Sequence, residues 1–102
     1  MITINELASK LNDMLKVDFN LTCSSFSRVI KNFGKLFNKK IDFSVTGDQL
    51  YVDRERNLIL KECLTHLIQN ASDHGIEHEG RIEINLRKTR DYITIKVLDN
   101  GK

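Results

Sequence analysis

One predicted helix of this sequence carries side chains that could do chemistry. Glu62, His66, Asn70 and His74 recur every four residues, and Asp73 lies beside them. An α-helix brings residues at this spacing onto one face. Asn, Asp and His form helices less readily than the Lys, Glu, Gln and Arg of most solvated faces. The pattern therefore indicates a binding site, with an ordinary polar helix face as the alternative.

Three kinds of chemistry could use this face. A zinc site is disfavoured because Asn is a poor zinc ligand, and two histidines eight residues apart lie about 12 Å apart along a helix. A nucleophilic site is weaker still, because Cys63 lies among leucines and is expected to be a small core residue. A magnesium–phosphate site fits better, because Mg²⁺ prefers oxygen ligands and keeps several waters. The Asn70 amide oxygen suits that role, and a neighbouring His can contact phosphate.

The helix that would position these residues is predicted over 54–74. Asp53 is a natural N-cap, and Gly75 is expected in the left-handed C′ position. Its core-facing stripe is predicted to be Leu60, Leu64, Leu67, Ile68 and Ala71.

Two further helices are predicted upstream. Residues 3–16 form an amphipathic helix with Thr3 as its N-cap, and its narrow stripe is Ile4, Leu7, Leu11 and Met14. Residues 26–37 form a second helix capped by Ser24 or Ser25, and its apolar face is Phe26, Val29, Ile30, Phe33, Leu36 and Phe37. A solvated basic face is expected from Arg28, Lys31, Lys35, Lys39 and Lys40.

The remaining segments alternate with period two and predict strands. Residues 40–46 are one strand, and after a turn at Gly47–Asp48 residues 50–52 are expected to return antiparallel to it. Residues 82–86 and 93–97 predict a hairpin around 89–91, and 99–102 are expected to be a polar loop. The expected fold is one α+β unit.

Composition excludes several classes of protein. The 102 residues carry a net charge of +2, which is weak for a dedicated nucleic-acid binder. No membrane span or signal peptide is predicted. The two cysteines lie far apart, so we expect free thiols in a reducing, cytoplasmic compartment.

Two segments resemble a known family. Residues 64–77 read Leu-Thr-His-Leu-Ile-Gln-Asn-Ala-Ser-Asp-His-Gly-Ile-Glu, which resembles the N box of the ATP-binding domain of CheA-type chemotaxis histidine kinases, H-L-x-R-N-x-x-D-H-G-I-E. Gln69 replaces the usual Arg. Residues 93–101 resemble the strand and the start of the G1 box, D-x-G-x-G. The resemblance implies a GHKL, or Bergerat-type, two-layer α/β sandwich with a mixed, mostly antiparallel sheet and about three helices. It implies a partial ATPase domain at 21–102, with the N box at 62–77 and the G1 start at 99–101, and it leaves residues 1–20 as a separate N-terminal amphipathic helix.

The resemblance implies roles for individual residues on the phosphate side. Asn70 would hold Mg²⁺ that bridges the ATP phosphates. His66 would order the metal waters and phosphates as the catalytic residue. His74 would line the pocket toward the phosphates, although His and Gly also suit an ordinary helix end.

The resemblance also places Asp73 in the wall of the nucleotide pocket. Asp99 would accept a hydrogen bond from the adenine amino group, and Gly101 would let the backbone approach the base. The alternative for Asp99 is the start of a turn.

The resemblance stops at Lys102, before the second glycine of the G1 box, so the lid, the later glycine-rich boxes and the remaining strands have no counterpart here. We expect the N-terminal half of a sensor kinase domain that uses ATP and Mg²⁺ to phosphorylate a histidine in two-component signalling. A fragment of a larger kinase and a naturally small protein are both open, and this chain alone is expected to be inactive. The alternative function is a non-catalytic, self-associating interaction module. Exposed apolar strands predict a homodimer, which could be domain-swapped.

Overall fold

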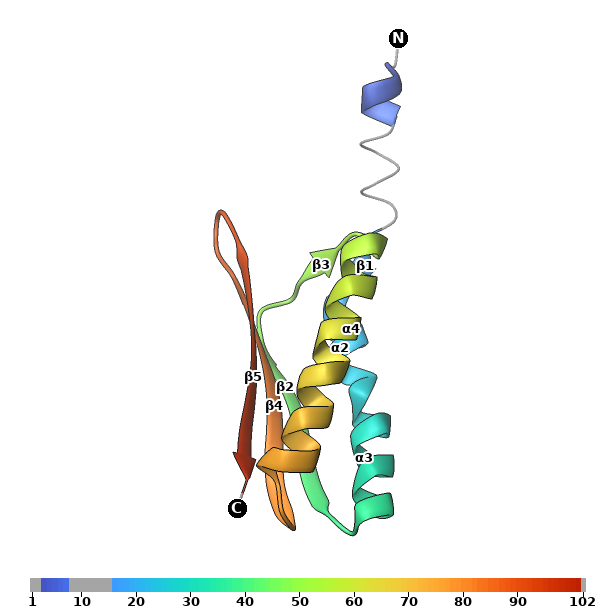
Figure 1. The fold of residues 1–102 in the computed structure, drawn as a ribbon. Coiled ribbons are helices and arrows are strands. Elements are labelled where there is room, and N and C mark those ends of the chain that lie inside the picture. The colour runs from blue at the N-terminus through green and yellow to red at the C-terminus, as the bar shows by residue number, and fades with distance from the viewer. Residues whose placement is uncertain (1–2, 8–15, 102) are drawn as a thin grey trace.

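The protein folds into a layer of helices packed on one face of a sheet (Figure 1). The structure, a computed structural model, describes residues 3–7 and 16–101. The helices are α2 (Phe19–Ser24), α3 (Phe26–Phe37) and α4 (Arg54–Asn70), and α4 continues into the π-helical turn η1 (Ala71–Gly75). The strands are β1 (Val17–Asp18), β2 (Lys40–Gly47), β3 (Tyr51–Val52), β4 (Glu79–Lys88) and β5 (Ile93–Gly101).

The predicted N-terminal helix is described only at its start. Residues 4–7 are helical, and the Thr3 hydroxyl accepts the Glu6 N–H at 3.2 Å, which confirms Thr3 as the N-cap. Leu11 and Met14 lie outside the described residues. Residues 17–20 belong to β1 and α2, and the division at residue 20 stays a prediction.

The main sheet has the order β2–β4–β5. Strands β2 and β4 are parallel, from Lys40 opposite Glu79 to Gly47 opposite Leu86. Strands β4 and β5 are antiparallel and form the predicted hairpin. A parallel pair needs a long crossover connection, and here that connection contains β3 and α4. The structure thus confirms the α+β class with a mixed sheet.

The predicted return of residues 50–52 onto the first strand is wrong. Strand β3 pairs antiparallel with β1 in a separate two-stranded sheet. The chain after Gly47 is held by β4, because Asp48 N–H donates to the Leu86 carbonyl at 2.8 Å. The Asp48 carboxylate also accepts the Lys88 N–H at 2.9 Å. These bonds direct the chain along β4, so it cannot reverse onto β2.

The core lies between the helices and the helix-facing side of the sheet. Ile82, Ile84 and Leu86 of the central strand are completely buried, which confirms the predicted alternation. The helices contribute Phe19, Cys23, Phe26, Ile30, Leu64, Ile68 and Ala71 to the same cluster. Short helix α2 was not expected, because six residues are too few to show a helical period.

The predicted apolar face of α3 is only partly buried. Phe26 and Ile30 belong to the core, whereas Val29, Leu36 and Phe37 are exposed. Strand β2 is an edge strand, so the sheet beneath α3 is narrower than the apolar stripe. Ser25 makes no side-chain cap to α3, since its hydroxyl donates to the Thr22 carbonyl at 2.6 Å.

The two cysteines differ in exposure. Cys63 is exposed on α4, so the expectation that it is a core residue is wrong, while Cys23 on α2 is buried. Both thiols are free, as predicted. Burial raises the pKa of the Cys23 thiol from 9.0 to about 12.

We expect N-ethylmaleimide to label one thiol in the folded protein and two in denaturant. Mass spectrometry counts the labels, and Cys63→Ser should leave the folded protein unlabelled. Folding raises the pKa of Cys23, so the protonated thiol is favoured in the folded protein. Its contribution to the free energy of unfolding is complete below pH 9 and is lost as the pH rises toward 12, because the thiol of the unfolded chain ionises first. Two labels at equal rates in the folded protein would contradict the burial of Cys23.

Within the part of the chain that the structure describes, no helix is both long and apolar enough to cross a membrane.

Candidate functional site

Helix α4 is oriented by its cap and by its buried stripe. The Asp53 carboxylate accepts the Arg56 N–H at 2.8 Å, which confirms the predicted N-cap. Leu64 and Ile68 are buried against the sheet, which sets the rotation of the helix. Leu67 departs from the predicted core stripe, because its side chain is 50% exposed.

The end of α4 differs from the prediction. The α-helix ends at Asn70, and residues 71–75 form the π-helical turn η1. Turns of this kind are frequent at functional sites. Gly75 is not left-handed, since the only glycine with positive φ among the described residues is Gly47. A Cβ atom at position 75 would instead lie 3.2 Å from the Asp99 carboxylate. A side chain at position 75 would therefore require the Asp99 carboxylate to shift by a few tenths of an ångström.

Asp99 lies on a strand and not in a loop, so the expected polar loop at 99–101 is wrong. Strand β5 continues to Gly101, with Asp99 opposite Ile82 and Gly101 opposite Gly80. Residues opposite each other in an antiparallel pair share a face of the sheet. Asp99 therefore lies on the same side as buried Ile82, toward the helices.

A cavity of about 220 Å³ brings part of the predicted site together. It is lined by Asn70 at the end of α4, by Gly75 in η1 and by Asp99 on β5. Its apolar walls are Leu67, Ala71 and Val97. The cavity explains why Leu67 is exposed: the side chain faces this hollow between helix and strand.

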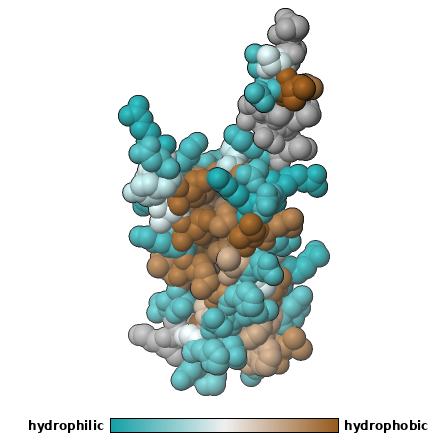
Figure 2. Space-filling view, turned by 45° about the horizontal axis from the view of Figure 1, so that its top comes forward, coloured by the Kyte–Doolittle hydropathy of each residue, from teal (hydrophilic) through white to brown (hydrophobic). Residues whose placement is uncertain are grey.

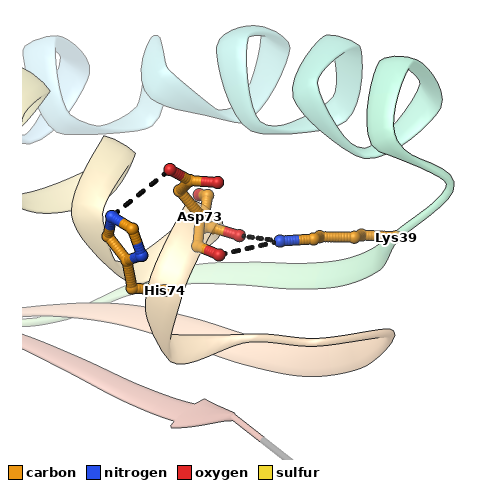
Figure 3. Close-up of polar contacts among 4 residues, drawn as sticks. Lys39, Asp73 and His74 are labelled. Atoms are coloured by element: carbon orange, nitrogen blue, oxygen red, sulfur yellow. Dashed lines mark hydrogen bonds and ion pairs between the residues drawn. The ribbon is translucent and has the colours of Figure 1, made fainter.

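The other predicted site residues lie outside this cavity. His66, Asp73 and His74 are exposed and do not line it. The Asp73 carboxylate lies 3.4 Å from Nε2 of His74 (Figure 3). No three His, Cys, Asp or Glu side chains among residues 3–7 and 16–101 are grouped to hold a metal ion. The roles predicted for these side chains, and for Gly101, stay predictions.

Sequence reasoning missed Lys39, which was assigned to a solvated basic face. Its Nζ donates to the carbonyls of Ser72 at 2.7 Å and Asp73 at 3.1 Å, so it spans from the α3–β2 connection to η1 (Figure 3). Nζ also lies 5.7 Å from the centroid of the Phe33 ring. A cation is well placed at carbonyls that a helix end leaves without partners.

The local backbone conformation directs the Lys39 side chain toward η1. Asn38 adopts a left-handed conformation with φ 53°, and Lys39 N–H donates to the Gly34 carbonyl at 2.8 Å. Gly34 itself allows this turn, because a Cβ there would lie 2.6 Å from the Lys39 carbonyl oxygen. In the sequence, an Asn followed by Lys at the end of a helix was the available indication of such a contact. This pattern does not distinguish Lys39 from Lys40.

Larger hollows lie elsewhere on the molecule. One of about 460 Å³ at the end of the sheet is lined by side chains of both charges, including Asp42, His78 and Arg81. Another of about 500 Å³ lies around the start of α4 and includes Tyr51 and Ile93. Neither contains Asn70 or its neighbours on α4, so the smaller cavity is the candidate site.

Comparison with known proteins points to histidine kinases. The chain is 32% identical over 108 residues to the chemotaxis protein CheA of Halobacterium salinarum, covering 95% of this chain and 16% of that protein. It is 29% identical over 107 residues to CheA of Bacillus subtilis, covering 94% of this chain and 16% of that protein. No protein-family model matches the chain.

A solved structure shares the fold. The Acinetobacter baumannii histidine kinase AdeS superposes with a TM-score of 0.59 at 21% identity, over 84% of this chain and 41% of that chain. The chain is thus homologous to part of CheA proteins and shares its α+β fold with part of a histidine kinase, which supports a kinase-type domain.

Proposed function

We propose that this chain is the N-terminal half of a histidine-kinase ATP-binding domain and that it binds Mg²⁺–ATP at the cavity between α4 and β5. The observation that carries the proposal is the meeting of Asn70 and Asp99 at one cavity, although they are far apart in the sequence. The similarity to CheA proteins supports the same conclusion. The parent protein would transfer the γ-phosphate of ATP to a histidine within a two-component system.

The cavity suits the base of the nucleotide. Its walls, Leu67, Ala71 and Val97, offer apolar contact to a flat ring. The Asp99 carboxylate can accept a hydrogen bond from the exocyclic amine of adenine, and Gly75 leaves room for that carboxylate. A volume of about 220 Å³ lies below the roughly 300–1,000 Å³ of most ligand pockets, so the base would enter and the phosphates would lie outside.

The phosphates would lie near the end of α4. The donor set fits Mg²⁺, because Asn70 offers an amide oxygen and ATP supplies phosphate oxygens, a combination typical of this ion. Bound Mg²⁺ would neutralise phosphate charge. His66 and His74 are exposed on the same helical segment, where they could contact phosphate or order water. Lys39 would keep η1, and with it the cavity wall, in position.

Isothermal titration calorimetry with Mg²⁺ and a non-hydrolysable ATP analogue tests the proposal. We expect Asp99→Asn and Asn70→Ala each to weaken binding at least ~10-fold, or about 1.4 kcal/mol. Gly75→Ala should also weaken binding, because its methyl group displaces the Asp99 carboxylate. Asp42→Asn and Asn32→Ala are matched controls, since both side chains are exposed away from the cavity.

If the control variants and the Asp99 and Asn70 variants bound nucleotide with equal affinity, the nucleotide would have to bind outside this cavity. Absence of heat at ~1 mM nucleotide, the weak end of measurable affinity, would overturn the proposal. That result would favour the second candidate, a non-catalytic interaction module. The observation favouring that module is the number of large apolar side chains left exposed, among them Leu36, Phe37 and Leu67.

A further inference from the structure

We propose that the groove between α3 and strand β2 binds an extended, acidic segment of a partner protein, which adds to β2 as a further strand. The groove lies at the edge of the main sheet opposite to β5. The proposal is therefore independent of the candidate nucleotide cavity, which lies between α4 and β5.

Strand β2 has backbone groups that the described residues leave unpaired. Its partner strand is β4, and the Lys40 N–H donates to the His78 carbonyl at 2.8 Å. Successive residues of a strand direct their N–H and C=O groups to opposite sides, so those of Ile41, Phe43 and Val45 are directed away from β4. Such an edge can accept an extended peptide as an added strand.

Helix α3 forms the second wall of the groove and packs along β2 (Figure 1). A hollow of about 230 Å³ lies between the helix and the start of β2, and its apolar lining is Ile30, Gly34 and Ile41. Strand β4 is described throughout and contributes no residue to the lining, so the hollow lies on the side of β2 away from β4. Every second side chain of an added strand would point toward α3.

The charge of this groove favours an anionic partner. Among the described residues that line the hollow none is acidic and four are lysines, namely Lys31, Lys35, Lys39 and Lys40. Lys39 is engaged with the carbonyls of η1, whereas the other three are exposed and have no acidic partner within the described part of the chain. The hollow thus contrasts with the broad apolar area in the middle of the face in Figure 2. Clustered like charges attract a segment of opposite charge.

The spacing of two lysines matches the spacing of an extended chain. Lys31 and Lys35 are four residues apart on α3, which is about 6 Å along the helix axis. Side chains i and i+2 of a strand lie on one face about 6.6 Å apart. Two carboxylates separated by one residue therefore reach both lysines, whereas adjacent carboxylates point to opposite faces. The partner segment is thus expected to carry an acidic residue at every second position.

A protein segment suits this groove better than a nucleic acid. Only a polypeptide can continue the hydrogen-bonding pattern of β2, and the net charge of +2 is weak for a nucleic-acid binder.

Fluorescence anisotropy of the full chain with a labelled peptide of four Thr-Glu repeats tests the proposal at low salt. We expect a dissociation constant of roughly 10–100 µM. A peptide of the same composition that repeats Thr-Thr-Glu-Glu should bind at least ~5-fold more weakly, because each of its faces then carries acidic residues only at every fourth position.

Charge reversal on the protein tests the two lysines. Lys31→Glu and Lys35→Glu should each weaken binding of the Thr-Glu peptide at least ~5-fold. Lys61→Glu and Lys96→Glu are matched controls, because they make the same charge change at exposed positions of α4 and β5 that do not line the hollow. Each control should change the affinity less than ~2-fold. Circular dichroism checks that all four variants fold.

Hydrogen exchange tests the added strand itself. On binding of the Thr-Glu peptide, the amides of Ile41, Phe43 and Val45 should become protected, because they gain hydrogen-bond partners. The amides of Asp42 and Ser44 should change little, since they are directed toward β4.

Three results would overturn the proposal. The first is the absence of binding at ~1 mM peptide. The second is equal affinity for the two peptide orders without protection of the three edge amides, or equally tight binding of oligothymidylate, either of which would indicate a non-specific basic surface. The third is a dimer in sedimentation equilibrium without peptide, with the same three amides protected, which would show that a second copy occupies the edge of β2.

Discussion

Gly47→Ala is expected to destabilise the protein by about 3–5 kcal/mol, which is a large part of the stability of a small domain. Gly47 ends β2 with φ 102°, a conformation that residues with a Cβ rarely adopt. A Cβ there would lie 1.9 Å from the Leu86 carbonyl oxygen, which also accepts the Asp48 N–H. Leu86 is completely buried in the central strand, so it has little room to move.

Urea unfolding followed by circular dichroism measures this loss. Ser44→Ala is the matched control, because Ser44 is a small, half-buried residue of the same strand and its φ is not positive. The control should change the free energy of unfolding by less than about 0.5 kcal/mol. An alanine variant as stable as wild type would show that β2 does not end against Leu86 as described.

Lys39→Met is expected to cost about 2 kcal/mol of stability and to loosen η1. The substitution keeps the aliphatic stem but removes the charged donor from the Ser72 and Asp73 carbonyls. Hydrogen bonds to charged groups contribute about 1.5–3 kcal/mol, and the partial exposure of Lys39 favours the lower part of that range. Amides of residues 71–76 should exchange with deuterium faster, because the turn has lost its link to α3.

Lys40→Met is the matched control, since it removes the same charge from an exposed neighbour. It should leave both stability and exchange of residues 71–76 close to wild type. Nucleotide binding gives a third measurement, in which Lys39→Met should weaken binding through the cavity wall. Equal exchange in the two lysine variants would contradict the role assigned to Lys39.

The candidate site was only partly predictable from the sequence. The pairing of Asn70 with Asp99 followed from a resemblance between motifs, and the cavity contains both. Gly75 was predicted for a local reason, a left-handed helix end, but its φ is not positive and its close neighbour is Asp99 of β5. The Asn–Lys pattern at the end of α3 did not single out Lys39, because its function depends on carbonyls 33 and 34 residues further along the chain.

The sequence by itself determined the elements whose causes are local. The caps Thr3 and Asp53, the start of α4 at Arg54 and the alternation of Ile82, Ile84 and Leu86 depend on neighbouring residues, and the structure agrees. Tertiary structure decided what depends on distant partners. Strand β3 pairs with β1 because β4 holds the chain after Gly47, and Leu67 is exposed because a cavity lies beneath it. Period and composition describe what a segment can bury, but only the packed fold decides which surface is available to bury it.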